Sequence, residues 1–352
     1  IISQPAWGVV ADRAKSKNRV LALQLILGLI MYFSYVLIPA GRSYTFALLL
    51  IVSAAAAIGY QGCVNLSDTI CLETLAPTRY QFDTVRSIGS FSYAFVALCV
   101  GISSMALHKD YDPAHMLIAF SLVMALSLIP LATLPHVRGH QSAADRQGGK
   151  KVSMSVLFQN PALVKVFAFG FLTAIPHTFA LNFFPIVFSD LGASNALINI
   201  YIFISAFTEV PFIFIAGKLA DRLSHRTIII AGALISALRY ALFAFIANPT
   251  VLLVTSPMLG IPTVVMVFSN IVYINRMAAP QLKASAQAIW SFLISSAAKI
   301  ISCLVGGFML DYMGRPASYG FWAVWNLAVV AIFLFILPRH KLSDIPQDGE
   351  TL

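Results

Sequence analysis

The sequence predicts an all-α, polytopic membrane protein made of two pseudo-symmetric six-helix bundles. Of its 352 residues, 59% are hydrophobic and only 11% are charged, whereas a soluble domain carries about a quarter charged residues. Its apolar runs recur at the length of about 20 residues that a membrane-spanning helix needs. A short phrase also occurs twice, as Gly-Val-Val-Ala-Asp-Arg at 8–13 and Gly-Lys-Leu-Ala-Asp-Arg at 217–222. A repeat of this long period indicates two homologous membrane-embedded halves.

The apolar runs predict one stub and ten full spans. The stub covers residues 1–10, and the spans are expected near 20–38, 44–67, 85–107, 114–134, 162–183, 195–217, 227–247, 250–274, 285–310 and 318–337. We expect the first span and most of the second to be missing from this chain, because restoring them would complete a set of twelve.

A polar stretch rich in Gly, Ser, Gln and basic residues divides the spans into two groups. The expected domains are an N-terminal bundle at 1–134, a cytoplasmic linker at 135–160, a C-terminal bundle at 161–337 and a cytoplasmic tail at 338–352. Lys and Arg concentrate in alternate loops, in this linker and in the tail. This bias predicts a multi-pass protein of the cell (inner) membrane with a cytoplasmic C-terminus.

Composition and motifs also exclude several functions. The net charge of +9 falls in loops between spans, so we attribute it to membrane topology and expect no nucleic-acid partner. The four cysteines form no Cys-x-x-Cys pair, and the chain has neither a P-loop nor a His-Glu-x-x-His motif. We therefore expect no enzyme, no metal and no cofactor, with a proton gradient as the energy source.

Five ionisable residues fall inside apolar spans, where a charge costs about 2.5–3.5 kcal/mol on insertion scales. They are Asp68, Arg86, Glu209, Arg239 and Lys299. Such residues are functional candidates because a charge at this depth is kept only where it has a use.

Counting along the helices places four of these charges in two pairs. Asp68 and Arg86 each lie nine residues from the centre of the turn between their spans, and Glu209 and Arg239 each lie fifteen residues from theirs. At 1.5 Å per residue, the partners share depths of about 13 Å and about 22 Å. We predict that each pair can interact, and a static ion pair that only fixes helix packing remains the alternative.

The other candidate binding residues share faces or depths with these charges. Gly89, Ser90 and Tyr93 follow Arg86 at helical spacing, which predicts a surface for a ring-bearing polar solute; ordinary packing of Tyr93 is the alternative. Histidine as a residue type titrates near neutral pH, as a proton coupler should, so His177 is a candidate, although it could be a hydrogen-bonded packing residue. Lys299 lies near mid-span, where it could meet a carboxylate, pair with Glu209 or exchange protons.

The repeated Gly-x-x-x-Asp-Arg phrase resembles the loop signature of the major facilitator superfamily, although Lys15 and Ser224 stand where that signature has Gly. The stretch 82–93 is similar to the fifth-span motif of the lactose permease and phenylpropionate permease branch, in which the Arg touches substrate. The resemblance implies the major facilitator fold, with two bundles rocking about a central site. The Lys, His and Glu set of lactose permease has no counterpart in span 250–274, so that proton relay is not implied.

We therefore predict a proton-coupled symporter, a monomer in the lipid bilayer, for a small polar solute such as a sugar, a nucleoside or an aromatic carboxylate. The predicted substrate-binding residues are Arg86, Ser90, Tyr93, Asn182, Glu209, Arg239 and Lys299. Those predicted to carry the proton are Asp68, Glu209 and His177, and those predicted to gate the conformational change are Gly8, Asp12, Arg13, Gly217, Asp221 and Arg222. A non-transporting assembly factor or sensor of the same fold and a drug-type antiporter are the alternatives.

Overall fold

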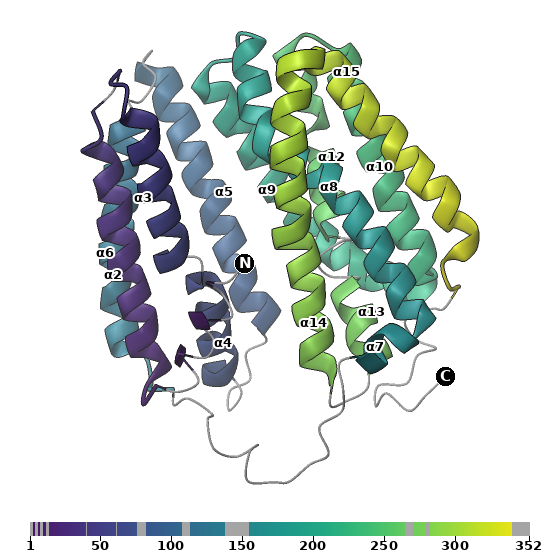
Figure 1. The fold of residues 1–352 in the computed structure, drawn as a ribbon, viewed down its shortest axis with the longest axis horizontal. Helices are drawn as coiled ribbons and strands as arrows, with labels where there is room; N and C mark the ends of the chain where they lie inside the picture. The colour runs from purple at the N-terminus through teal and green to yellow at the C-terminus, as the bar shows by residue number, and fades with distance from the viewer. Residues whose placement is uncertain are drawn as a thin grey trace. The chain divides into compact units, whose positions relative to one another are not determined.

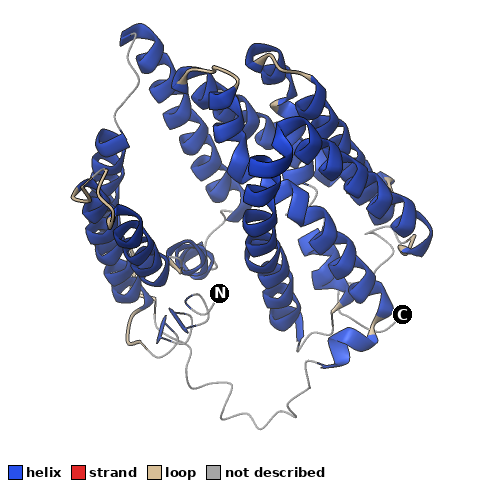
Figure 2. Cartoon of the chain, turned by 45° about the horizontal axis from the view of Figure 1, so that its top comes forward, coloured by secondary structure: helices blue, strands red, loops and turns tan. Residues whose placement is uncertain are grey.

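A computed structural model shows helices throughout the part of the chain that it describes (Figure 2). The described residues are 3, 6, 7, 10, 11, 14–39, 41–60, 62–75, 82–107, 113–137, 155–264, 270–278 and 282–339. Five of these helices are long and apolar enough to cross a membrane. The predicted all-α, multi-span architecture is confirmed.

The chain forms two compact units, which are best described one at a time. Unit 1 comprises 1–86 and 110–150, and unit 2 comprises 87–109 and 151–352. The helix α5 (Phe82–Leu107) therefore begins in unit 1 and continues in unit 2. Gly101 of α5 approaches α9 so closely that a Cβ would lie 3.3 Å from the carbonyl oxygen of Ala196. The domain boundaries expected from the sequence stay a prediction.

Unit 1 is built around one long helix, which packs along its neighbours (Figure 1). This helix is α2 (Lys17–Val36), and its neighbours are α3 (Thr45–Tyr60), α4 (Cys63–Leu75) and α6 (Pro113–Thr133). Its apolar core includes Leu21, Leu25, Leu66 and Ile70. Since α2 contacts all three neighbours, it supports the whole unit.

The predicted span 44–67 is divided into α3 and α4, which corrects the expectation of one continuous helix. A Cβ on Gly62 would lie 2.6 Å from Nε2 of Gln24 and 2.9 Å from Cβ of Trp7, so only glycine permits this close approach. The carbonyl of Ile58, near the end of α3, accepts hydrogen bonds from Trp7 Nε1 and Ser3 Oγ, both at 2.7 Å. The break is thus accompanied by hydrogen bonds from side chains distant in the sequence, which help to satisfy the backbone as a membrane interior requires.

Unit 2 contains the remaining helices. The long ones are α8 (Pro161–Asp190), α9 (Asn195–Arg222), α10 (His225–Phe245) and α15 (Ala298–Ile336). The short ones are α7 (Ser155–Gln159), α11 (Pro249–Leu252), the 3₁₀ turn η1 (Leu253–Thr255), α12 (Pro257–Val264), α13 (Asn270–Met277), α14 (Lys283–Ser291) and the π-helix η4 (Phe292–Ala297). The predicted spans 250–274 and 285–310 are therefore interrupted, the first of them within a segment containing Pro257 and Pro262.

The helix α15 covers two predicted spans joined by a sharp turn. Gly314 has φ +72°, a conformation that favours glycine, and Pro316 follows it. Arg315, between them, donates from Nη1 to the carbonyl of Ile246 at 2.8 Å and to the carbonyl of Phe243. These bonds fasten the turn to the end of α10, because a cation there satisfies carbonyls without helical partners.

Candidate solute site

Four of the predicted residues lie at similar depths in unit 2. The counts start from the helix ends that Figure 1 shows near the lower edge. From these ends, His177 lies 16 residues along α8, Glu209 lies 13 along α9 and Arg239 lies 14 along α10. Lys299 lies 16 residues after the start of α14. At 1.5 Å per residue, these counts correspond to about 20–24 Å along each helix. The residue counts along α9 and α10 are thus similar for Glu209 and Arg239, and the equal depth expected for these two residues stays a prediction.

The predicted Glu209–Arg239 ion pair, however, is not formed. Arg239 is only 1% exposed, and it donates to the hydroxyl oxygen of Tyr201 from Nε at 3.1 Å and from Nη2 at 2.9 Å. Its guanidinium carbon also lies 4.9 Å from the centre of the Phe243 ring, a cation–π distance. Arg239 instead contacts a residue of α9 that precedes Glu209 by eight positions, so equal counts along the two helices did not predict its partner.

Glu209 lies at a close crossing of α9 with α12. A Cβ on Gly260 would be 3.3 Å from Glu209 Cγ, and one turn away Ser205 donates to the carbonyl of Ser256 at 3.1 Å. The carboxylate remains half-buried and interacts electrostatically with the exposed Tyr93 on α5. The structure thus brings together two predicted solute-binding residues that are far apart in the sequence.

A second polar group joins α8 and α15. Asn182 donates from Nδ2 to Sγ of Cys303 at 3.5 Å, and Lys299 precedes Cys303 by one turn. Lys299 is the second residue after the π-helix η4. Such helices are rare in proteins, and those that occur are often found at functional sites. Its side chain is exposed, which corrects the expectation of a deeply buried lysine, and no described acid forms an ion pair with it. It does not pair with Glu209.

His177 is buried beside a helix kink and is an electrostatic neighbour of Arg239. Pro176 lacks the N–H that would bond the carbonyl of Leu172. The indole of Trp325 donates to that carbonyl instead, at 3.0 Å. The side chain of Trp325 therefore satisfies the carbonyl that Pro176, the neighbour of His177, leaves without its helical donor.

Several predicted residues lie outside what the structure describes. Gly8, Asp12 and Arg13 belong to this group, and for Arg86, Ser90, Gly217 and Asp221 only their place on a helix is known. Asp68 is half-buried on α4, and Arg222 is exposed at the end of α9. The predicted Asp68–Arg86 pair and the gating roles stay predictions.

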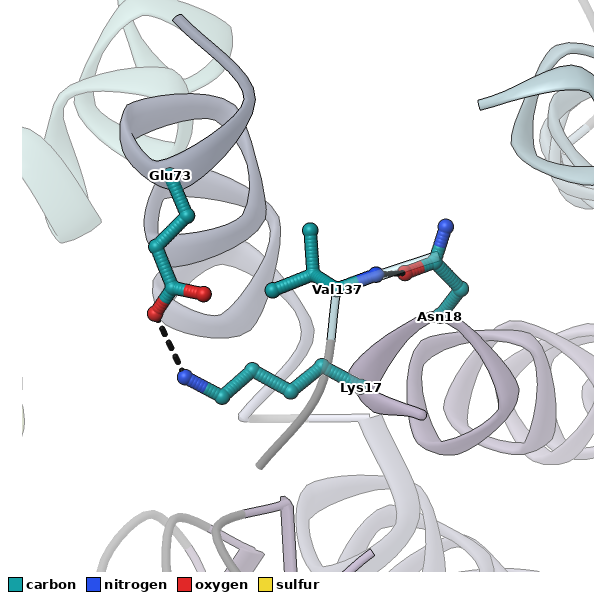
Figure 3. Close-up of polar contacts among 4 residues, drawn as sticks. All are labelled: Lys17, Asn18, Glu73 and Val137. Carbon is teal, nitrogen blue, oxygen red and sulfur yellow. Dashed lines mark hydrogen bonds and ion pairs between the residues drawn. The ribbon is translucent and has the colours of Figure 1, made fainter. Parts of the chain in front are cut away.

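One polar cluster in unit 1 is missing from the sequence predictions (Figure 3). The buried Lys17 contacts Oε1 of Glu73 through Nζ at 2.6 Å and so joins α2 to α4. Asn18 donates to the carbonyl of Pro135 and accepts from the N–H of Val137, both at 3.1 Å. Lys17 belongs to the basic run that follows the first Gly-x-x-x-Asp-Arg phrase, and that position is the signal from which this contact could have been predicted.

Comparison with known proteins identifies the family of this chain. Residues 1–321 match the MFS_1 like family, and the chain belongs to it. The protein is therefore a major facilitator superfamily transporter, not an enzyme. The narrower resemblance to the lactose permease branch stays a prediction.

Related proteins cover nearly the whole chain. The maltose permease of Geobacillus stearothermophilus is 25% identical over 348 residues, which are 97% of this chain and 83% of the permease. The nucleoside permease NupG of Escherichia coli (strain K12) is 23% identical over 370 residues, with coverages of 98% and 86%. A crystal structure of NupG (D323A mutant) superposes with a TM-score of 0.78 at 19% identity, covering 96% and 87% of the chains. The crystal structure of a D-xylose-proton symporter reaches 0.71 at 18% identity, covering 99% and 85%.

Proposed function

We propose that the protein is a proton-coupled symporter of a small polar organic solute in the inner membrane, with its C-terminus in the cytoplasm. The solute classes are a sugar, a nucleoside or an aromatic carboxylate. The observation that supports this most directly is the position of Glu209 and Lys299. Glu209 lies near the middle of α9 and Lys299 at the start of α15, both are at least partly open, and neither forms an ion pair with a described residue.

The proposed solute contacts follow from the chemistry of these side chains. The exposed ring of Tyr93 offers a face for a sugar or aromatic ring, and Glu209 beside it accepts hydrogen bonds from hydroxyl or amino groups. Asn182 and Lys299 supply donors for a carboxylate or hydroxyl oxygen. Arg86 and Ser90 belong to the same proposed set through their position on the Tyr93 face of α5.

Arg239 takes a different place in this proposal. Its guanidinium is enclosed and bound to Tyr201. In this conformation Arg239 therefore positions neighbouring side chains and does not contact the solute itself. Glu209, His177 and Asp68 are the proposed proton carriers. Glu209 is favoured among them because it combines partial exposure with a position beside the proposed solute contact Tyr93.

The test uses the full chain in proteoliposomes with an inward proton gradient. Maltose, uridine, xanthosine and phenylpropionate are offered separately, and internal solute is measured with and without a protonophore. We expect one class to accumulate above equilibrium and to lose this accumulation when the gradient is dissipated. The Glu209→Gln variant should lose gradient-driven accumulation but keep solute exchange at equal concentrations.

The matched control is Asp190→Asn, which removes an exposed acid at the end of α8 and should behave as the unmodified protein. Loss of flux in Arg86→Lys with normal folding would support a direct role of the planar guanidinium, since lysine keeps only the charge. Absence of flux and of any ligand-dependent thermal shift for all four solutes would contradict the proposal and favour the non-transporting alternative.

A further inference from the structure

Unit 2 carries an apolar groove that the proposed solute site does not use. It lies between α8 and the segment formed by α14 and η4, beside α7, at the end of the helices that Figure 1 shows near its lower edge. Its volume of about 380 Å³ falls within the range of roughly 300–1,000 Å³ that is typical of small-molecule sites. The described residues that line it are all apolar, and they include Phe158, Val164, Phe167, Ala168, Phe171 and Phe292.

The floor of this groove is firmly packed. Phe167 is only 4% exposed and stacks on the ring of Trp290 at a centroid distance of 6.4 Å. Trp290 in turn fills the space beside Gly170, where a Cβ would lie 2.3 Å from its ring. The side walls are different, because Phe158 and Phe292 are 58% and 47% exposed. The groove is therefore a fixed hollow with exposed aromatic edges, and its own floor cannot move outward to fill it.

The groove runs along α8 from the end of the span towards its interior. From Val164 to Phe171 its lining extends seven residues along this helix, which is about 10 Å at 1.5 Å per residue. Val164 is the fourth residue of α8, so the groove begins close to the helix end. The opposite wall includes Phe292 and Leu293 at the start of the π-helix η4, and such helices often mark functional sites. An occupant can therefore enter at the membrane surface and lie with its apolar part inside the bilayer.

Basic side chains lie at the same end of unit 2. The charged side chains that the structure describes there are Lys165, Arg222, Arg226 and Arg276, near the ends of α8, α9, α10 and α13. Lys165 adjoins the groove, since it follows Val164 directly and precedes Ala168 by one helical turn. It is half-buried, and no described acid forms an ion pair with it. Because a lysine near the end of a span extends its ammonium towards the membrane surface, this end of the groove attracts an anion.

We propose that the groove binds an anionic phospholipid, with one acyl chain against Phe158, Phe171 and Phe292 and the phosphate beside Lys165. The two features select this occupant together. A neutral apolar molecule would leave Lys165 without a counter-ion, and a water-soluble anion would not cover the aromatic lining. A phospholipid with a negative headgroup satisfies both, since its chain packs in the fixed groove and its phosphate is attracted to basic residues at the membrane surface. This lipid site does not depend on which solute is transported.

Photo-cross-linking locates the lipid. The full chain is placed in phosphatidylcholine nanodiscs that contain a trace of phosphatidylglycerol or of phosphatidylcholine, each with the same diazirine-labelled acyl chain, and mass spectrometry identifies the cross-linked peptides. We expect the phosphatidylglycerol probe to label 158–171 and 289–293 about fivefold more than the phosphatidylcholine probe, the factor that one basic side chain near an anionic lipid contributes. Unlabelled phosphatidylglycerol should compete with this labelling, and inorganic phosphate should not.

Two pairs of variants separate the headgroup from the chain. Lys165→Gln should remove the preference for phosphatidylglycerol, whereas Arg226→Gln, which removes a half-buried basic residue at the start of α10, should retain it. Ala168→Phe fills the groove and should reduce the labelling of both segments by both probes. Ala162→Phe is its control, because Ala162 lies on α8 but does not line the groove. The preference measured in the unmodified protein decides the matter if a variant does not fold.

Two results would overturn the proposal. Equal labelling by the two probes in the unmodified protein would show ordinary boundary lipid without a headgroup site. Preferential labelling that lies elsewhere in the chain, or that survives both Lys165→Gln and Ala168→Phe, would show that the groove is not the binding site. Neither result bears on solute transport, which the flux assay measures separately.

Discussion

The contact between Arg239 and Tyr201 offers the sharpest test of the physical reasoning. Tyr201→Phe removes only the hydroxyl oxygen that accepts from Nε and Nη2 of the guanidinium. The phenylalanine ring should keep the packing of Tyr201 against Phe184 and Phe188. The substitution therefore isolates the hydrogen bonds from the aromatic packing.

The expected loss follows from burial and charge. Hydrogen bonds to a charged group contribute about 1.5–3 kcal/mol each, and an unpaired buried donor adds its desolvation cost. Since the two bonds share one oxygen, and the cation–π contact with Phe243 remains, we expect a loss of about 3 kcal/mol. At roughly 2–4 °C per kcal/mol, the Tm should fall by roughly 6–12 °C.

Thermal unfolding of the purified full chain in detergent measures this effect, with Tyr319→Phe as the matched control. Tyr319 is also fully buried in the same aromatic cluster, but its hydroxyl has no hydrogen-bond partner in the described part of the chain. Its removal should change the Tm little or raise it. Equal Tm losses in the two variants would refute the assignment of Tyr201 as the partner that stabilises Arg239.

Further predictions concern packing and the ion pair of unit 1. Gly170→Ala should destabilise by about 1–3 kcal/mol, because its Cβ would lie 2.3 Å from the buried Trp290 ring; urea or thermal unfolding measures this. Gly320→Ala should stabilise the protein by roughly 0.5–1 kcal/mol in the same assay, since no atom lies within 4 Å of its Cβ position, and a loss would contradict the packing seen there. Glu73→Gln should destabilise by about 1–3 kcal/mol, because it removes the negative charge of the carboxylate that contacts the buried Lys17 ammonium. The double variant Lys17→Met, Glu73→Leu should recover most of that loss, and additive effects in a double-mutant cycle would argue against the pairing.

The helical, multi-span character of the chain could be predicted because it depends on local composition. A run of apolar residues at the length of the bilayer is visible without any partner. The breaks within these runs could not, because each depends on a contact distant in the sequence. Glycine is needed at position 62 because Gln24 and Trp7 approach it closely in the folded chain. The turn at Gly314 has a positive φ, a conformation that a glycine in the sequence permits but does not predict.

The candidate site illustrates the same limit. Counting residues along α9 and α10 predicted the depths of Glu209 and Arg239, because the rise per residue of a helix is constant. The direction of each side chain depends on how the helices are rotated about their axes, and the count contains no such information. A signal was nevertheless present for Arg239, which continues a stripe with Gly232, Ser236 and Phe243 at helical spacing. Such a stripe of small and aromatic residues indicates a packed interior face.

The charges in unit 2 connect the proposed proton site to the choice of solute. The described side chains of this layer include two basic residues, Arg239 and Lys299, against one carboxylate, Glu209. Protonation of Glu209 would leave both cations uncompensated, so it should strengthen the binding of an anionic solute, and by reciprocity the anion should promote protonation. For an aromatic carboxylate we therefore expect the Kd, measured by calorimetry, to fall as pH falls, and to lose this dependence in Glu209→Gln. A neutral sugar or nucleoside has no charge through which its binding could be coupled to the protonation of Glu209. A steep gain in the affinity of such a solute at low pH would therefore contradict the electrostatic argument.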